Sequence, residues 1–356
     1  MARLFGVDLT REALSKHVGD SSQVAGIRQM QLSDGHEAGV RIADIRTGSG
    51  LRFQISLDRG MDISIAEYKG IPLSWRSASG DVHPAYFDPR GTEWRRSFPG
   101  GLMTGCGMTY LGAACVDQGV ELGLHGRLSH IPATNVNTSS RWDGDTCVMK
   151  VEGMVRESQL FGENLILKRS VEVRLGESTI GINDTVTNDG TDRTPLMMLY
   201  HFNLGWPLVD AGTTLLVNSR GMRPRDADAE AGVATVRQCP EPERAYREQL
   251  FYYDLLADAD GYATTLLLNK RLQLGFYLRI RLAELPRFIW LKNMAEGLYM
   301  VGMEPANCHV EGRGKERQRG TLQFIDPGEL QSFAVLAGIL EGDNQITPFV
   351  TKYRLQ

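Results

Sequence analysis

The sequence predicts an all-β protein, a large antiparallel β-sandwich with few short helices. Short stretches with apolar residues at alternate positions recur along the chain, spaced roughly ten residues apart. Glycine, asparagine, aspartate or proline residues, which favour turns, separate many of these stretches. Helical patterns are few and short. Many strands with few helices are typical of an antiparallel sandwich or barrel.

The clearest strand is residues 51–57, where Leu51, Phe53, Ile55 and Leu57 alternate with polar residues. The side chains of a strand point alternately to its two faces, so this stretch has one apolar and one polar face. Similar patterns predict strands at residues 147–155, 165–175, 178–187, 195–204, 213–218, 263–268, 272–280, 287–292, 298–303, 320–325 and 331–339.

Helices are expected at only a few places. Residues 10–18 are expected to form one with Thr10 as its N-cap, because a threonine hydroxyl can accept a hydrogen bond from the first helical turn. Residues 92–96 are expected to begin another. The segment 240–249 is ambiguous between element types.

Two polar segments are expected to be loops. Residues 219–248 have the weakest pattern, and we interpret them as a long excursion because strand patterning resumes after them unchanged. The charged residues 312–319 are expected to form a solvated hairpin connection. Neither segment marks a domain boundary, so residues 1–356 are predicted to form a single domain.

The charge balance excludes some classes of partner. The net charge is −4, from 39 basic and 43 acidic residues, so the chain lacks the positive excess that nucleic-acid binding requires. It gives no reason to expect an anionic membrane as a partner. No stretch of about 18 apolar residues predicts a transmembrane helix. The N-terminus has no signal-peptide pattern, and we therefore expect a cytoplasmic location.

The cysteines favour the same compartment. The number is odd, five, and no C-x-x-C pair occurs, so a disulfide framework or structural zinc site is not expected. Reduced thiols in a cytoplasmic protein are the simpler interpretation. The cysteines are Cys106, Cys115, Cys147, Cys239 and Cys308.

Several apolar strand faces continue into an ionisable or polar residue. Burying such a group deep in a core costs several kcal/mol unless it is paired, so these residues are expected at the rim or floor of a cleft. Arginine, histidine and glutamate together supply a base, an acid near neutral pH and donors for hydroxyl oxygens. The residues in these positions are Arg59, His201, Asn203 and Glu304.

Three short stretches resemble the aldose 1-epimerase, or galactose mutarotase, family. They are YHFNLGWP at 200–207, GMEPAN at 302–307 and GLHGR at 123–127. Further stretches are similar to a bacterial subgroup of this family whose members are mostly uncharacterised, and this resemblance spans roughly residues 50–340. These stretches are LDRGMDI at 57–63, SFPGGL at 97–102, GLHGRLSHIPA at 123–133, LFGEN at 160–164 and PLMMLYHFNLGWP at 195–207.

The resemblance implies a galactose mutarotase-like supersandwich that binds a sugar and interconverts its anomers by acid–base ring opening. It implies Glu304 as the base, His201 as the acid and His125 as a sugar-binding histidine that donates to the ring oxygen or a neighbouring hydroxyl. One spacing differs. The family histidine lies four residues before the asparagine, whereas His201 lies two before Asn203, a displacement of about 7 Å along a strand.

Other residues are expected to bind the substrate. Arg59 and Arg127 could hold sugar hydroxyls, or a carboxylate or phosphate if the substrate is acidic. Arg127 would share a strand face with His125. Asn203 and Lys292 are further candidates. Three tryptophans could stack on a sugar ring, although burial is their more usual role: Trp75, Trp206 and Trp290.

No cofactor is expected, because ring opening needs only a positioned acid and base. Histidines and a carboxylate could in principle form a metal site. No H-x-H or H-x-x-x-H pair occurs, however, and no metal site is predicted. The expected partner is a small sugar, and open sheet edges could pair in a homodimer. The histidines concerned are His83, His125, His130 and His201.

Two other functions stay open at this point. The same acid and base could isomerise, epimerise or eliminate at another sugar carbon. A non-catalytic sugar sensor would keep Arg59, His125 and the aromatic residues but would not need Glu304. A purely structural protein is disfavoured, since polar residues at so many strand-face ends would then have no common purpose.

Overall fold

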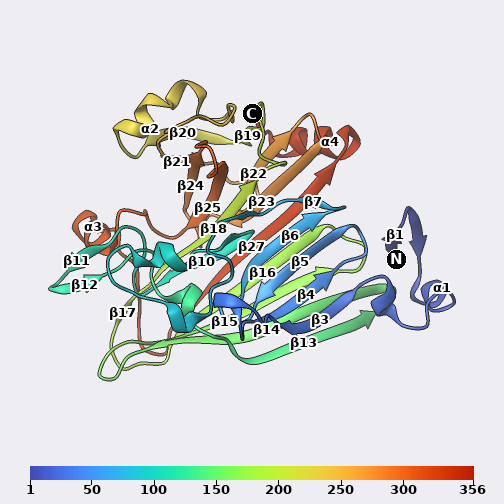
Figure 1. Ribbon diagram of the computed structural model, residues 1–356, viewed down its shortest axis with the longest axis horizontal. Coiled ribbons are helices and arrows are strands. Elements are labelled where there is room, and N and C mark those ends of the chain that lie inside the picture. Colours follow the sequence, from blue (N-terminus) through green and yellow to red (C-terminus); the bar gives the residue numbers. More distant parts are fainter.

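The computed structural model describes residues 1–356, and most of the strands belong to two antiparallel sheets packed face to face (Figure 1). The larger sheet has 11 strands. In spatial order they are β20 (Ser219–Pro224), β21 (Gln249–Leu255), β24 (Arg287–Asn293), β25 (Met300–Ala306), β18 (Met197–Gly205), β10 (Met103–Met108), β6 (Asp62–Tyr68), β5 (Leu51–Ser56), β4 (Arg41–Arg46) and β3 (Gly26–Gln31), with β7 (Ile71–Pro72) beside β6.

The smaller sheet has 8 strands and covers the inner face of the larger one. Its spatial order is β13 (Thr134–Asp143), β14 (Thr146–Ser158), β15 (Asn164–Arg174), β16 (Thr179–Asn188), β27 (Leu330–Glu341), β23 (Leu274–Arg281), β22 (Tyr262–Asn269) and β19 (Thr214–Val217). Short pairs complete the strands: β1 (Ala2–Leu4) with β2 (Val7–Leu9), β8 (Trp75–Arg76) with β9 (Gly100–Gly101), β11 (Cys115–Asp117) with β12 (Val120–Leu122), and β17 (Thr194–Pro195) with β26 (Phe324–Ile325).

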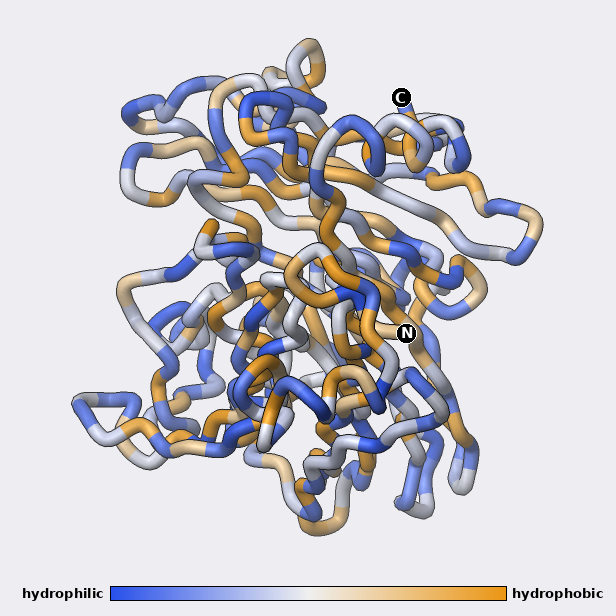
Figure 2. The backbone as a smooth tube through the Cα atoms, turned by 90° about the vertical axis from the view of Figure 1, so that its right-hand side faces the viewer, coloured by the Kyte–Doolittle hydropathy of each residue, from blue (hydrophilic) through white to orange (hydrophobic).

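The main core lies between the two sheets, and the alternation of side chains builds it. Along β14, Met149, Val151, Gly153 and Val155 are buried, and the residues that alternate with them are partly exposed. Phe53 and Ile55 of β5 enter the same core from the larger sheet. Figure 2 shows this alternation as changes of colour along the backbone. The predicted all-β sandwich with few helices is therefore confirmed.

The helices are α1 (Arg11–Ser15), α2 (Ala227–Ala231), α3 (Arg313–Arg319) and α4 (Asp343–Tyr353). Thr10 caps α1 as predicted, and its hydroxyl accepts from the Ala13 N–H at 3.0 Å. None of these helices is long and apolar enough to span a membrane.

The sequence prediction was wrong in three segments. Residues 312–319 form helix α3 instead of a hairpin connection, because Glu316 turns inward and accepts from His309 at 3.0 Å. Residues 219–248 are not a plain loop, since they contain β20 and α2. The C-terminal helix α4 was not expected. In each case contacts with distant residues stabilise an element that the local pattern does not reveal.

The outer face of the larger sheet carries a second, smaller apolar cluster. Leu199, Leu250, Ile289 and Leu291 belong to it, and they lie on neighbouring strands of that sheet. Trp94, from the short 3₁₀ helix η4 (Glu93–Ser97), packs onto the same cluster. This covered outer face contains the site described next.

Candidate active site

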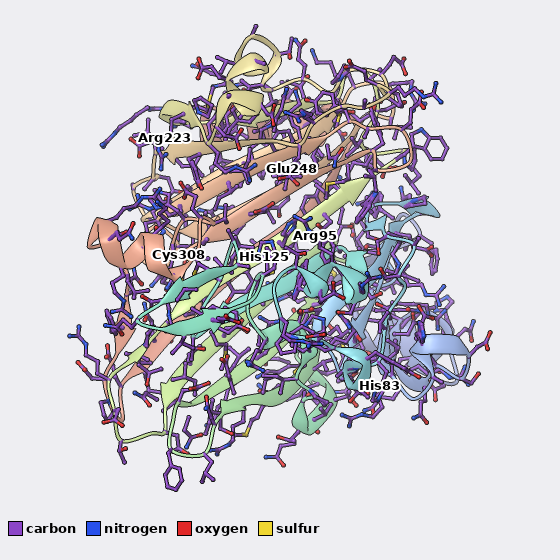
Figure 3. The ribbon with its side chains drawn as sticks, turned by 60° about the vertical axis from the view of Figure 1, so that its left-hand side comes forward. His83, Arg95, His125, Arg223, Glu248 and Cys308 are labelled. Carbon is purple, nitrogen blue, oxygen red and sulfur yellow. The ribbon has the colours of Figure 1, made fainter.

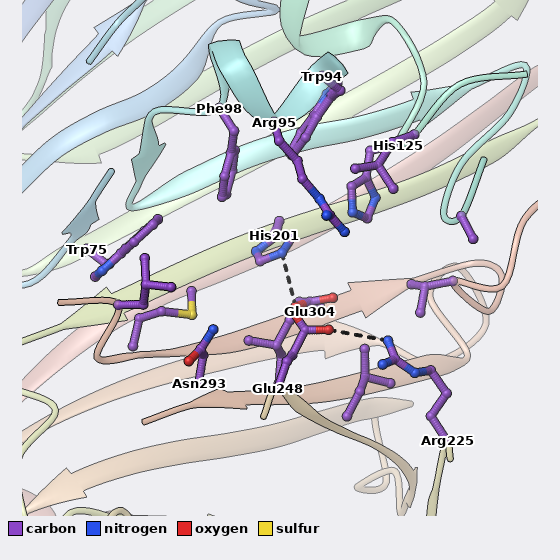
Figure 4. A pocket seen from close by; sticks show the side chains of 17 residues that line it. Trp75, Trp94, Arg95, Phe98, His125, His201, Arg225, Glu248, Asn293 and Glu304 are labelled. Carbon is purple, nitrogen blue, oxygen red and sulfur yellow. Dashed lines mark hydrogen bonds and ion pairs between the residues drawn. The ribbon is translucent and has the colours of Figure 1, made fainter. Parts of the chain in front are cut away.

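A cavity of about 350 Å³ opens on the outer face of the larger sheet. Strands β18, β21, β24 and β25 form its floor, and η4 and the loop around residue 125 form one wall (Figure 4). In Figure 3, Arg95 and His125 lie in the middle of this face. The volume lies within the range usual for small-molecule sites. The floor side chains are His201, Leu250, Leu291, Met300 and Glu304.

His201 and Glu304 stand opposite each other on adjacent antiparallel strands. Phe202 of β18 pairs with Met303 of β25, so the register places His201 directly across from Glu304. The Nε2 atom of His201 lies 3.2 Å from Oε1 of Glu304, although the two groups are not aligned as a hydrogen bond. Both side chains point outward from the sandwich, into the cavity (Figure 4).

Gly302 makes room for the Glu304 carboxyl group. The two residues lie on the same face of β25, two positions apart. A Cβ atom at position 302 would collide with Oε1 of Glu304. The glycine therefore allows this carboxyl group to lie back along its own strand, beside His201.

Burial sets the protonation of the pair. Glu304 is 1% exposed and His201 is 5% exposed. Burial, and then the Glu248 carboxylate, raise the pKa of Glu304 well above its usual value. Burial, and then His125, lower the pKa of His201 to about 3. Burial therefore favours the uncharged form of both groups, a protonated carboxyl group beside a neutral imidazole.

His125 enters the cavity from a tight turn. Its φ of 58° and the φ of 82° at Gly126 are both left-handed, an uncommon conformation for a histidine. The turn is held because the His125 carbonyl accepts from the Gly107 N–H at 2.9 Å, and a Cβ at Gly126 would collide with the Gly107 carbonyl. The Nδ1 atom of His125 is buried without a partner. Burial, and then Arg95, lower the pKa of His125 to about 4.

Aromatic rings line the wall next to the histidines. Trp94 and Phe98 stack with their centroids 4.6 Å apart. The Trp94 ring lies 4.8 Å from the His125 ring, and the Phe98 ring lies 5.6 Å from the His201 ring. Trp75 extends the same wall (Figure 4). An apolar wall facing a polar pair is an arrangement suited to a sugar ring, which has apolar C–H faces and polar edges.

Residues 37–339 match the family described as "Domain of unknown function (DUF4432)". The chain belongs to this family. No curated protein matches the sequence. The DUF4432 chain nevertheless has the galactose mutarotase-like fold, as the solved structures show.

A candidate aldose 1-epimerase from Klebsiella pneumoniae has 24% identity and a TM-score of 0.89, with 94% of this chain and 90% of that chain covered. A galactose mutarotase-like protein from Clostridium acetobutylicum has 12% identity and a TM-score of 0.58, with 90% of this chain and 99% of that chain covered. Galactose 1-epimerase from Lactobacillus acidophilus has 13% identity and a TM-score of 0.57, with 89% of this chain and 99% of that chain covered.

Three of the predicted binding residues lie outside the cavity of the DUF4432 protein. Arg59 is buried and donates to the carbonyls of Val82 and Ser97. Asn203 is buried and donates to the His201 carbonyl at 2.8 Å. Lys292 lies on the opposite face of β24 from Leu291, and its Nζ donates to the Thr235 carbonyl at 2.9 Å. Arg59 and Asn203 thus bind backbone carbonyls next to the site, whereas Lys292 binds a carbonyl that does not belong to the cavity lining.

Arg127 does not share a strand face with His125, because the chain turns sharply between them into the 3₁₀ helix η5 (Leu128–His130). Arg127 instead lines a separate cavity near β11 and β12. Of the other predicted residues, Trp206 is exposed and Trp290 is buried. His83 caps a 3₁₀ turn and lies apart from the site (Figure 3), and His130 bonds to Ser97.

Sequence reasoning missed several residues of the wall. Trp94, Arg95 and Phe98 line the cavity together. The signal was the run WRRSF at 94–98, whose last two residues begin the SFPGGL stretch. Arg225, Glu248 and Asn293 also line the cavity. No set of three or more histidine, cysteine, aspartate or glutamate side chains is arranged to hold a metal ion.

Proposed function

We propose that this protein is an aldose 1-epimerase-type isomerase, which interconverts the anomers of a sugar by acid–base ring opening. The observation that carries the proposal is the His201–Glu304 pair, buried at the cavity floor with Nε2 and Oε1 3.2 Å apart. Such a pair can take and give a proton at neighbouring oxygen atoms of one ligand. The mutarotase-like fold supports the same class of reaction.

The proton transfers balance without any cofactor. His201 takes the proton of the anomeric hydroxyl, and Glu304 gives its proton to the ring oxygen as the bond from C1 to that oxygen breaks. Rotation about C1–C2 presents the other face of the new carbonyl group. The ring oxygen then attacks C1, its proton returns to Glu304, and His201 returns its proton to O1. Each group therefore acts as acid and as base in one cycle, but ring opening begins with His201 as the base and Glu304 as the acid, the reverse of the roles that the resemblance implies.

The charged state formed during ring opening is also accommodated. Proton transfer converts a neutral pair into an imidazolium and a carboxylate. The two groups are already 3.2 Å apart, so the charges that develop attract each other. The aromatic wall of Trp94 and Phe98 excludes water from one side of the cavity, which strengthens that attraction.

Anomer exchange measured by proton NMR tests the proposal. Wild-type protein is compared with Glu304→Gln across aldoses, ketoses, uronic acids and sugar phosphates. We expect accelerated exchange for at least one sugar and a loss of about 10²–10⁴-fold in the variant. Glu296→Gln, at an exposed glutamate outside the cavity, is the matched control.

Other outcomes lead to other functions. Exchange that survives Glu304→Gln would refute the assignment of the pair. Deuterium entering a carbon-bound position from D₂O would indicate an isomerase or epimerase acting at another carbon, because anomerisation exchanges no carbon-bound hydrogen. Binding without any exchange would indicate a sugar sensor.

A further inference from the structure

Arg95 brings a positive charge into the cavity and has no carboxylate partner. Its guanidinium group extends from η4 into the cavity near His125 (Figure 4). The next residue, Arg96, does not line the cavity and pairs with Glu93 at 2.6 Å. The two adjacent arginines therefore differ in their partners. Arg96 is paired with a carboxylate at the surface, whereas Arg95 has no such partner and lies beside the proposed reaction site.

The other charges of the cavity compensate one another. Arg225 pairs with Asp226 at 2.7 Å and with Glu248 at 3.4 Å. Burial raises the pKa of Glu304 and so favours its uncharged form. His125 is uncharged near neutral pH, since burial and Arg95 lower its pKa to about 4. Arg95 is thus the one charge in the cavity that the protein itself does not balance.

The surroundings of Arg95 favour an anion. Trp94 of η4 and Phe98, directly after η4, line the cavity with it, and apolar walls strengthen electrostatic attraction compared with open water. The planar guanidinium group can donate two parallel hydrogen bonds to a carboxylate or a phosphate. A neutral sugar would leave this charge without a counterion in the bound complex.

We propose that the substrate is an anionic sugar, whose carboxylate or phosphate group is bound by Arg95. The inference rests on the proposed function and adds the substrate class. Ring opening requires a free anomeric hydroxyl at the His201–Glu304 pair, so the anionic group is carried by a carbon other than C1. The pair on the floor binds the anomeric end of the sugar, and Arg95 on the wall binds the charged end.

The test measures binding and exchange separately. Dissociation constants from calorimetry and exchange rates from NMR are obtained for glucose, galactose, their uronic acids and their 6-phosphates. The uronic acids and phosphates distinguish the two kinds of anion. Wild-type protein is compared with Arg95→Gln, Arg95→Lys and the control Arg96→Gln. Arg95 is exposed, so its replacement is expected to leave the melting temperature unchanged, and this is measured as well.

We expect one anionic group to bind at least tenfold more tightly than the parent neutral sugar. Arg95→Gln is expected to weaken that binding about 10- to 100-fold, Arg95→Lys to restore part of it, and Arg96→Gln to change nothing. Equal binding of neutral and anionic sugars, or anion binding that survives Arg95→Gln, would overturn the inference and leave the isomerase proposal standing. Binding that depends on Arg95 without anomer exchange would support the inference and refute the isomerase.

Discussion

Tyr200 of β18 donates its phenolic hydroxyl to the Asp184 carboxylate of β16 at 2.7 Å. This bond joins the two sheets in the middle of the sandwich, where Arg169 also donates to Asp184 at 2.7 and 3.0 Å. His201, the next residue of β18, points to the opposite face and into the cavity. A buried ionic cluster therefore fixes the strand that carries the proposed catalytic histidine.

Replacement of Asp184 is expected to destabilise the fold strongly. Asp184→Ala removes the nearest carboxylate partner of the fully buried Arg169 and leaves it only Asp62, 3.5 Å away, so we expect the free energy of unfolding to fall by about 3–5 kcal/mol. Urea denaturation checks this. Asp189→Ala, which removes an exposed pair with Arg156, is the control and is expected to cost less than about 1 kcal/mol. Similar small losses in both variants would contradict the structural role of the cluster.

Gly302→Ala is expected to impair catalysis without impairing binding. The added methyl group collides with Oε1 of Glu304 and displaces the carboxyl group from His201. We expect the exchange rate to fall up to about 100-fold while the dissociation constant of the sugar stays the same. Gly221→Ala is the control, because an added methyl group meets nothing there. A wild-type rate in Gly302→Ala would show that the position of the carboxyl group is not critical.

Acid is expected to destabilise the protein through His201. An unfolded histidine binds a proton below about pH 6.5, whereas the buried His201, with its pKa lowered to about 3, stays neutral. Between these values the unfolded state binds more protons, so stability falls as the pH is lowered from 6.5. The contribution is at most about 1.4 kcal/mol per pH unit.

This slope is measured by urea denaturation at pH 7 and pH 5.5. Between these two pH values, His201→Asn is expected to lose less stability than the wild type. His17→Asn, at an exposed histidine, is expected to lose as much stability as the wild type. Glu304 opposes the trend, because a carboxyl group with a raised pKa lowers stability as the pH rises above 4.5. An identical slope in His201→Asn and the wild type would indicate that folding does not shift the pKa of His201.

Arg127→Ala is expected to leave sugar binding and anomer exchange unchanged. Arg127 lines a different cavity from the His201–Glu304 pair, so it has no route to a ligand held there. Titration calorimetry and NMR exchange with the best substrate check this. A tenfold or greater loss of affinity would show that the two cavities act together on one extended ligand.

The sequence by itself determined the fold class and the proposed reacting pair. Alternating apolar residues are a local property, and a period of two is enough to predict strands and to place Glu304 and His201 at the ends of apolar faces. The short motifs around these residues resemble those of the mutarotases, and the solved structures confirm the fold. Local capping, as at Thr10, was equally predictable.

Only the tertiary structure decided which polar residues meet. Arg59, Asn203 and Lys292 looked like cleft residues, yet each satisfies a backbone carbonyl outside the cavity. Arg95 was not among the predicted site residues, yet it extends into the cavity toward His125 (Figure 4). The alternation along a strand predicts which side chains share a face. The pairing register, the turns and the covering loops decide which residues lie opposite those side chains. These features could not be predicted because they depend on contacts between residues far apart in the chain.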